Sequence, residues 1–292
     1  MNIVLFGKNG QLGWEFQRIL PILGELISLD REEQDLCDLQ ALERTLRELK
    51  PSLIVNASAY TDVDRAEQES ELAIRINALA PGVMAEMSRK LGATFIHYST
   101  DYVFDGTKNS PYTEDDEVNP LNMYGKSKLR GEENIKQTGD AYLILRTSWV
   151  YSLRGNSFVN KVLGWARKNS TVRVVNDQIS SPTWARMLAE ITSFLIAQNG
   201  TDLYERILER RGIYHLAGSG YTSRYEWAKE ILASGPDRSE DIFQSIEPAR
   251  SEEFPTPATR PLFSALDSTR FESTFGLRLP PWDKTLKLAM AG

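Results

Sequence analysis

The amino-acid sequence predicts an α/β protein in which a doubly wound parallel sheet of the Rossmann type precedes a smaller mixed α/β domain. Short apolar runs alternate with amphipathic stretches through the first half of the chain, which is typical of a parallel sheet flanked by helices. A glycine-rich turn directly follows the first apolar run. After about residue 150 the alternation loosens, so we place the two domains at residues 1–150 and 151–292.

The first domain is expected to contain five strands, because five short apolar runs are bounded by turn residues or by amphipathic stretches. These strands are expected at residues 2–6, 25–30, 53–56, 93–98 and 142–146. Helices are expected between them at residues 12–23, 38–49 and 64–90, and around Tyr124 and Lys128. Asp38 is the expected N-cap of the second helix. Pro81 and Gly82 are expected to interrupt the third.

The second half is expected to be mixed. Helical patterns lie near residues 156–169, 183–199, 223–234 and 281–290, and short strands are expected at 172–175, 212–216 and 241–246. Later elements, in particular the helix at 183–199, are candidates to pack back onto the first sheet, so the boundary at 150 is approximate. We expect residues 151–292 to form a substrate-binding domain, with the substrate in the cleft between the two domains.

Composition excludes several classes of function. A net charge of −6 and a pI of about 5.2, with no basic stripe, argue against nucleic acid as a partner. Cys37 is the single cysteine and there are two histidines, so we predict neither an internal disulfide nor a metal site. No apolar run approaches the ~20 residues of a membrane span, and strand-like sequence begins at residue 2. A cytoplasmic protein without a membrane partner is predicted.

The glycine-rich turn indicates a dinucleotide site. Gly7, Gly10 and Gly13 end the first strand and open a helix, so that a pyrophosphate can rest on the helix N-terminus. Asp30 ends the second strand, where a carboxylate accepts hydrogen bonds from the adenosine ribose and favours NAD. Arg31 follows it and suits a 2′-phosphate, so both NADH and NADPH stay open. Small residues at 57–59 leave room for the cofactor at the end of the third strand, although tight packing also explains them.

Tyr124 and Lys128 suggest a proton donor beside that cofactor. Their i, i+4 spacing places both side chains on one helix face. A free tyrosine has a pKa near ~10, and a neighbouring ammonium lowers it toward the working range. Alone, such a spacing is usually a surface pair. Thr100, at the end of the fourth strand, adds a hydroxyl that faces the ligand cleft and polarises a carbonyl. The set favours a nicotinamide-dependent enzyme that acts on a carbonyl or an alcohol.

The chain resembles the extended short-chain dehydrogenase/reductase family, in particular reductases of dTDP-linked 4-keto-6-deoxy sugars. The resemblance runs along nearly the whole chain, through residues 7–15, 55–67, 97–106, 120–128, 146–151 and 257–261. It implies NADH- or NADPH-dependent reduction of the 4-keto group of dTDP-6-deoxy-L-lyxo-4-hexulose. The product would be dTDP-L-rhamnose, formed in the final step of its synthesis and used for surface polysaccharide.

The resemblance also implies roles for individual residues. Tyr124 and Lys128 are expected to be catalytic and to touch the cofactor, Thr100 to tune the tyrosine and touch the substrate, and Asp101 and Trp149 to hold the sugar. The residues expected to line the dinucleotide, besides the glycines of the turn, are Gln11, Leu12, Asp30, Asp38, Leu39, Ala57, Ser58 and Ala59.

Two further residues are singled out from their chemistry. An indole at the end of a strand, such as that of Trp149, stacks on a pyranose ring or caps the sheet as a core residue. Arg260 is our expected contact to the substrate diphosphate, because a planar guanidinium matches phosphate oxygens; a surface arginine is the other interpretation. His97 and His215 are expected to be core residues, and the acidic run at 114–117 a solvated loop.

One departure from the family and several alternatives stay open. Some relatives bind magnesium between subunits through glutamates; one matches Glu15, but the second falls at Arg186, so that bridge and the dimer depending on it are in doubt. We expect a monomer or a homodimer. The alternatives to the leading function are a reductase of another keto sugar, a nucleotide-sugar epimerase or dehydratase, and a non-catalytic regulatory subunit of the same fold.

Overall fold

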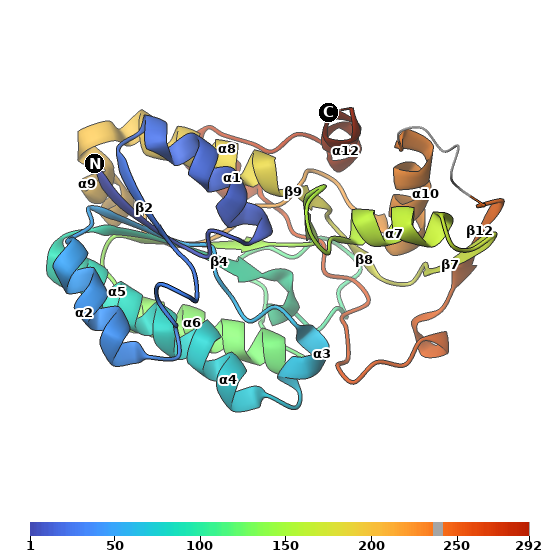
Figure 1. Cartoon of the computed structure of the whole chain (residues 1–292), viewed down its shortest axis with the longest axis horizontal. Helices are drawn as coiled ribbons and strands as arrows, with labels where there is room; N and C mark the ends of the chain where they lie inside the picture. The colour runs from blue at the N-terminus through green and yellow to red at the C-terminus, as the bar shows by residue number, and fades with distance from the viewer. Residues whose placement is uncertain (236–241, 292) are drawn as a thin grey trace.

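The protein is built around a six-stranded parallel sheet (Figure 1). The computed structural model describes residues 1–235 and 242–291. The strand order is β10-β5-β4-β3-β1-β2, and every neighbouring pair is parallel. The strands are β1 (Asn2–Phe6), β2 (Glu25–Leu29), β3 (Leu53–Asn56), β4 (Thr94–Thr100), β5 (Tyr142–Thr147) and β10 (Gly212–His215). The Rossmann-type fold class is confirmed, with a sixth strand contributed from the second half of the sequence.

Helices cover both faces of this sheet (Figure 1). On one face lie α1 (Gln11–Ile19), α8 (Ala185–Asn199) and α9 (Leu203–Glu209), whose apolar side chains share a core with Ile3 and Leu5 of β1. On the other lie α2 (Leu39–Leu49), α5 (Ala80–Leu91) and α6 (Met123–Thr138), which share a core with Val4 and Phe6. Adjacent residues of β1 thus point to opposite cores, as strand geometry requires. Because α8 packs on α1, residues 185–199 lie on the first sheet.

The helical stretch after β3 differs from the expectation. It consists of α3 (Val63–Ala66), α4 (Ser70–Ile74), a π-helical turn η2 (Arg75–Leu79) and α5. The expected interruption at Pro81 and Gly82 is wrong, since the backbone stays helical from 70 to 91 and the gap lies at 67–69. Pro81 occupies the first turn of α5, where its missing N–H is not needed. The Ala80 N–H donates to the Arg75 carbonyl, which is the wider bond of a π turn.

Most of the remaining elements form a smaller unit beside the carboxyl ends of the main strands, whereas α11 (Thr269–Phe275) packs on β10 of the main sheet. The core of the smaller unit joins Tyr151 and Trp227 to other apolar residues of α7 (Phe158–Ala166), α10 (Arg224–Ser234) and α12 (Trp282–Met290). The parallel pair β7 (Thr171–Val175) and β12 (Ser245–Ala249) flanks α7 and α10 in Figure 1. A strand was expected at 241–246; Asp241 lies outside the described residues, and β12 begins at Ser245. The other bounds are β6 (Val150–Tyr151), β8 (Ile179–Ser180), β9 (Thr183–Trp184) and β11 (Thr222–Ser223). Single 3₁₀ turns complete the described elements at η1 (Leu20–Ile22), η3 (Asp101–Val103), η4 (Gly200–Asp202) and η5 (Ser251–Glu253).

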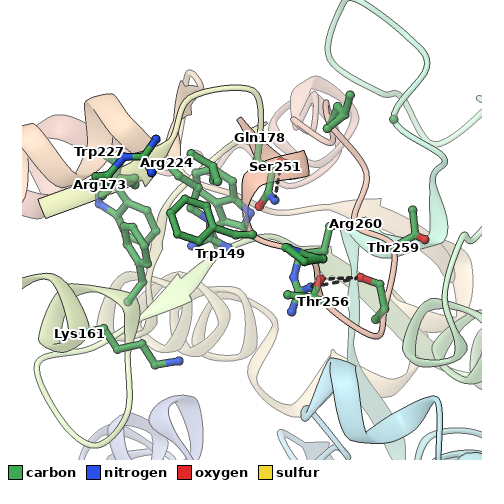
Figure 2. A pocket seen from close by; sticks show the side chains of 18 of the residues that line it. Trp149, Lys161, Arg173, Gln178, Arg224, Trp227, Ser251, Thr256, Thr259 and Arg260 are labelled. Atoms are coloured by element: carbon green, nitrogen blue, oxygen red, sulfur yellow. Dashed lines mark hydrogen bonds between the residues drawn. The ribbon is translucent and has the colours of Figure 1, made fainter. Parts of the chain in front are cut away.

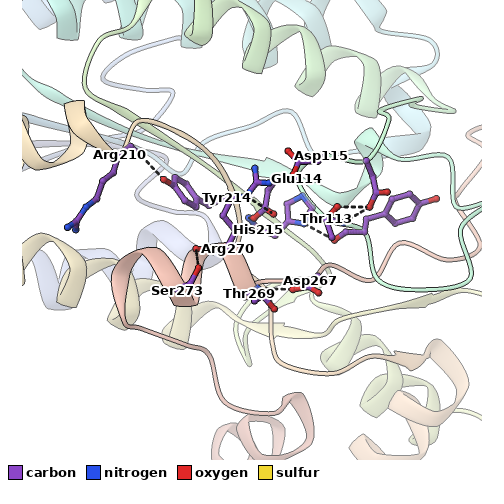
Figure 3. Close-up of polar contacts among 12 residues, drawn as sticks. Thr113, Glu114, Asp115, Arg210, Tyr214, His215, Asp267, Thr269, Arg270 and Ser273 are labelled. Carbon is purple, nitrogen blue, oxygen red and sulfur yellow. Dashed lines mark hydrogen bonds and ion pairs between the residues drawn. The ribbon is translucent and has the colours of Figure 1, made fainter.

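The acidic loop is tied to β10 through a buried carboxylate (Figure 3). The Glu114 side chain is only 3% exposed, and it accepts the His215 N–H at 2.7 Å. The expectation of a fully solvated loop is therefore wrong for Glu114, whose buried charge is balanced by Arg270 at 3.6 Å. His215 is fully buried, which confirms it as a core residue. Its Nδ1 lies 3.0 Å from the Tyr112 carbonyl oxygen, and burial lowers the pKa of His215 to about 3.

Of the helices formed by the described residues, none is both long and apolar enough to cross a membrane. The division of the chain near residue 150 stays a prediction. The sheet strand β10 and the helix α8 both come from beyond that point in the sequence and pack on the first 150 residues.

Candidate active site

The glycine turn forms a close backbone contact between β1 and β3. Gly7 has a φ of +86°, and a Cβ on it would lie 2.8 Å from the Ser58 nitrogen. A Cβ on Gly13 would lie 2.0 Å from the Gly7 carbonyl oxygen. Only glycine fits these two positions. The N-cap of α1 is Gly10, which has no side-chain cap, so the first N–H groups of this helix are available to an anion. The turn therefore fits a dinucleotide pyrophosphate.

A cavity of about 210 Å³ lies beside this turn and brings several predicted residues together. Its lining includes Gly7, Asp30, Arg31, Ser58 and Ala59. Asp30 Oδ2 accepts the Asn9 N–H at 3.0 Å, and its Oδ1 accepts the Arg31 N–H at 2.7 Å. This carboxylate thus fixes the turn as well as facing the cavity. Both an acid and a cation stand where an adenosine ribose would lie.

Other predicted cofactor residues are placed differently. Asp38 caps α2 by accepting the Ala41 N–H at 2.9 Å, and neither it nor Leu39 lines the cavity. Leu12 is a core residue, 7% exposed. Gln11 lines the neighbouring larger cleft, and its buried Oε1 has no hydrogen-bond partner. A buried amide oxygen without a protein partner at the N-terminus of α1 fits Gln11 to contact a ligand in this cleft.

Tyr124 and Thr100 meet where β4 ends and α6 begins. The helix is started by Asn122, whose side chain accepts the Gly125 N–H at 2.9 Å and so places Tyr124 in the first turn. The ring of Tyr102 packs edge-on against that of Tyr124, with 5.7 Å between centroids. Burial raises the pKa of Tyr124, and the Thr100 hydroxyl opposes that rise. The phenol is therefore held protonated and has a hydroxyl partner. The expected lowering of its pKa is wrong for this structure, because burial raises the pKa and the Lys128 amine contacts Tyr98 and His97 instead.

Lys128 is directed at β4. Its Nζ donates to the Tyr98 carbonyl at 2.6 Å and lies 3.2 Å from His97 Nε2, and these are its two hydrogen-bond contacts in the described structure. The sequence-based expectation of an ammonium directly beside the Tyr124 phenol is not what this arrangement shows. Lys128 is 2% exposed, and a buried amine turns to the nearest hydrogen-bonding groups. The contact to His97 was not predicted.

Asp101 lies beneath the cleft wall. Its carboxylate accepts hydrogen bonds from the hydroxyl groups of Ser264 at 2.5 Å, Ser180 at 3.1 Å and Thr100 at 3.1 Å. Burial raises the pKa of Asp101 to about 6, and the three hydroxyls oppose that rise. At 2% exposure and outside the cleft lining, Asp101 ties Thr100 to Ser180 of β8 and to Ser264, both from the second half of the chain. A direct sugar contact requires it to become uncovered.

The large cleft of about 1650 Å³ carries a wall of stacked rings (Figure 2). Trp149 has a φ of +41°, an unfavourable conformation for a bulky residue, and such strain concentrates at binding sites. Its indole stacks on Trp227 at 5.5 Å, with 13° between planes. The guanidinium carbon of Arg224 lies 3.8 Å from the Trp149 ring centre. Trp149 is therefore placed to present a flat surface with an attached cation.

Arg260 also lines the cleft but is already engaged. It donates to Asp64 at 2.7 Å and to Thr256, beside which it lies in Figure 2. Arg224, by contrast, forms no ion pair with an acidic side chain in the described part of the chain, although it faces the same cleft. Burial lowers the pKa of Arg224 to about 10, which leaves it cationic at neutral pH. Sequence reasoning missed this residue because no motif marks it; its position at the start of α10, after the Ser223 N-cap, is the one signal available.

Of the two residues aligned with magnesium ligands, Glu15 lies on α1 and Arg186 on α8. Arg186 pairs with Glu190 at 2.9 Å on the surface of α8. Among residues 1–235 and 242–291, no three His, Cys, Asp or Glu side chains are grouped so as to hold a metal ion.

Comparisons with known proteins agree with this geometry. The model of the RmlD substrate binding domain family matches residues 1–292. The dTDP-4-dehydrorhamnose reductase of Burkholderia thailandensis is 41% identical over 287 residues, which are 97% of this chain and 95% of that protein. The solved structure of the enzyme of that name from Clostridium acetobutylicum aligns with a TM-score of 0.90 at 35% identity, covering 100% of this chain and 99% of the other. A further structure of that name, from Bacillus anthracis in complex with NADP, aligns with a TM-score of 0.89 at 33% identity, covering 99% and 98%. The chain belongs to the RmlD substrate binding domain family.

Proposed function

We propose that this protein is a dTDP-4-dehydrorhamnose reductase, which uses NADPH or NADH to reduce the 4-keto group of dTDP-6-deoxy-L-lyxo-4-hexulose to dTDP-L-rhamnose. One observation carries the proposal. Tyr124, which is protonated and has Thr100 as its partner, begins α6 beside the carboxyl end of β4, at the same edge of the parallel sheet as the glycine turn that follows β1. This arrangement supports a proton donor that acts beside a dinucleotide bound at the turn. The names of the similar proteins support the sugar and the cofactor.

The residues have separate roles in this proposal. The bound nicotinamide supplies a hydride to C4 of the sugar. Tyr124 gives its phenolic proton to the O4 atom as the C=O bond becomes C–OH, and solvent then reprotonates the phenolate. Thr100 orients the carbonyl oxygen from the strand side. Lys128 holds the nicotinamide ribose and stabilises the phenolate, for which its amine must turn away from β4.

The cofactor residues in this proposal are those that line the small cavity and the turn, with Gly10 and Gln11 at the helix start and Ala57 beside Ser58. Asp30 favours a free ribose hydroxyl, whereas Arg31, whose side chain is 81% exposed, is available to a 2′-phosphate. Asp38 and Leu39 contribute to this site by fixing the start of α2 and do not line the cavity themselves. Use of both NADH and NADPH is expected from this pairing.

For the substrate, Trp149 is proposed to stack against a ring of the dTDP sugar, and Arg224 to bind its diphosphate. Arg260 remains a second diphosphate candidate, provided that it exchanges its bond to Asp64. A cytoplasmic location and a monomeric or homodimeric state complete the proposal; light scattering after size-exclusion chromatography measures the latter.

The test is reduction of enzymatically prepared dTDP-6-deoxy-L-lyxo-4-hexulose by the purified protein, followed by identification of the product by NMR. We expect one reduced nicotinamide to be consumed for each dTDP-L-rhamnose formed. Conversion of the sugar without net oxidation of the cofactor would point to an epimerase or dehydratase instead. Cofactor binding with no conversion of this sugar would point first to a different keto sugar and then to a regulatory subunit.

A further inference from the structure

Lys128 ends a buried chain of hydrogen bonds that begins at the cofactor cavity. The Ser58 N–H and hydroxyl donate to Asn56 Oδ1 at 3.1 and 2.6 Å. Asn56 Nδ2 lies 3.0 Å from His97 Nδ1, and His97 Nε2 lies 3.2 Å from Lys128 Nζ. Asn56 and His97 are directly paired across β3 and β4, and both are fully buried. The mechanism proposed above gives no role to His97.

The donors and acceptors in this chain are fixed from the Ser58 end. A backbone N–H is only a donor, so the Asn56 atom that faces Ser58 must be the amide oxygen. The Asn56 NH₂ group, which is only a donor, then faces His97 Nδ1. His97 Nδ1 must therefore be the acceptor, and a neutral imidazole carries its proton on Nε2.

That proton faces Lys128, and it determines which form of the lysine fits. A lysine ammonium has three donors and no acceptor, so it would oppose the Nε2–H. A neutral amine accepts the Nε2–H with its lone pair and still donates to the Tyr98 carbonyl at 2.6 Å. Protonating His97 instead is worse, because its Nδ1 already receives the Asn56 N–H. The chain is satisfied throughout only when Lys128 is uncharged.

The charged groups around Lys128 do not reverse this preference. Glu132, one turn along α6, is already committed to Arg146 of β5 at 2.9 and 2.7 Å and to Ser99 of β4 at 2.5 Å. Asp101 of η3 is held by its three hydroxyls, and Tyr124 is protonated. Burial lowers the pKa of Lys128 to about 8 against the opposing effect of Glu132, and burial together with Lys128 lowers that of His97 well below its usual value.

We propose that His97 is a positioning residue that holds Lys128 as a neutral amine in the cofactor-free protein at mildly alkaline pH, and that dinucleotide binding releases this lysine and makes it take up a proton. The inference rests on the proposed function, because it requires a dinucleotide at the glycine turn. The phosphates of the dinucleotide place negative charge at the same side of the sheet. Its ribose hydroxyls offer the Lys128 ammonium acceptors, whereas the His97 Nε2–H is a donor. Above about pH 8, a cation at Lys128 is then formed only when the cofactor is present.

Isothermal titration calorimetry of NADPH binding measures directly how many protons the protein takes up from the buffer. At pH 8.5, in buffers of different ionisation enthalpy, we expect net uptake of about half a proton or more per NADPH. The NADPH affinity is expected to weaken by up to about tenfold per pH unit above pH 8, because uptake of one proton has that slope. The control variant is His97→Asn, whose amide still meets Asn56 but leaves nothing at the Nε2 position. Its proton uptake should fall toward zero.

A second measurement does not depend on a variant. Lys128 in the cofactor-free wild type, labelled with ¹³C at Cε and assigned by loss of its signal in Lys128→Arg, should titrate near pH 8 rather than near ~10.4, and should be charged at pH 8.5 once NADPH is added. Tight NADPH binding without proton uptake, or an ordinary titration in the free protein, would overturn this inference and leave the proposed function standing. Absence of any dinucleotide binding would overturn both.

Discussion

The guanidinium carbon of Arg224 lies 3.8 Å from the centre of the Trp149 ring, and the same indole stacks on Trp227 of α10. Two stacked indoles and a cation that lies close to both, from two separate parts of the chain, therefore form one wall of the cleft. Stacking of this kind restrains the arginine, so that less rotamer freedom is lost when it binds an anion.

Replacing Arg224 with methionine is expected to raise the KM for the dTDP sugar by about 10- to 100-fold, since a charge-assisted hydrogen bond to phosphate is worth about 1.5–3 kcal/mol. The KM for NADPH should stay within about twofold. Steady-state kinetics in both substrates measures the two values. Arg260→Met is the matched comparison, and we expect a smaller rise, because Arg260 is already paired with Asp64. Equal KM values for wild type and Arg224→Met would remove Arg224 from the site.

Removing the phenolic hydroxyl in Tyr124→Phe is expected to lower kcat by about 10²- to 10⁴-fold, the usual contribution of a positioned proton donor. The affinity for NADPH, measured by fluorescence titration, should change little, because the ring and its contact with Tyr102 remain. A loss of less than tenfold would mean that another group donates the proton.

The buried ion pair between Arg146 and Glu132 is expected to contribute to the stability of the fold. The two side chains are 3% and 1% exposed and are joined by two hydrogen bonds. Glu132→Gln leaves a buried arginine unpaired and is expected to reduce the free energy of unfolding by about 3–5 kcal/mol. The double variant Glu132→Met/Arg146→Met should lose less. Urea denaturation of the three proteins tests this; equal losses in the single and double variants would contradict it.

His215 makes stability depend on pH. Its folded pKa of about 3 lies below the unfolded value of ~6.5. As pH falls below 6.5 the unfolded chain takes up a proton that the folded chain refuses, so stability is lost between about pH 6.5 and pH 3. At pH 5 this amounts to about 2 kcal/mol.

His215→Asn, which keeps an N–H for the Tyr112 carbonyl, should show a correspondingly smaller loss between pH 7 and pH 5. Comparing the two proteins cancels the opposite contribution of Asp101, whose raised pKa stabilises the fold as pH falls through 6. Parallel stability curves for wild type and variant would show that His215 is not the responsible group.

The fold could be predicted from sequence where local pattern and burial agree. The buried strands and the glycine turn are marked by short apolar runs and by positions where a Cβ does not fit, so β1 and Gly7 were placed correctly. The π turn before Pro81 was not foreseen, because proline signals a break unless it happens to fall in a first helical turn. The site required tertiary knowledge: nothing near Lys128 in the sequence indicates that its amine meets His97. Likewise, the burial of Glu114 depends on β10, about a hundred residues away.

The late position of β10 in the chain has a consequence for synthesis on the ribosome. β5 ends at Thr147, but its outer edge is not paired until residues 212–215 have been made. At about 5–20 residues per second, an apolar strand edge is therefore exposed for on the order of several seconds in every nascent chain. A messenger truncated before codon 212 leaves that edge permanently open, and the resulting fragment should associate with itself or with chaperones, whereas the complete chain closes the sheet on its own.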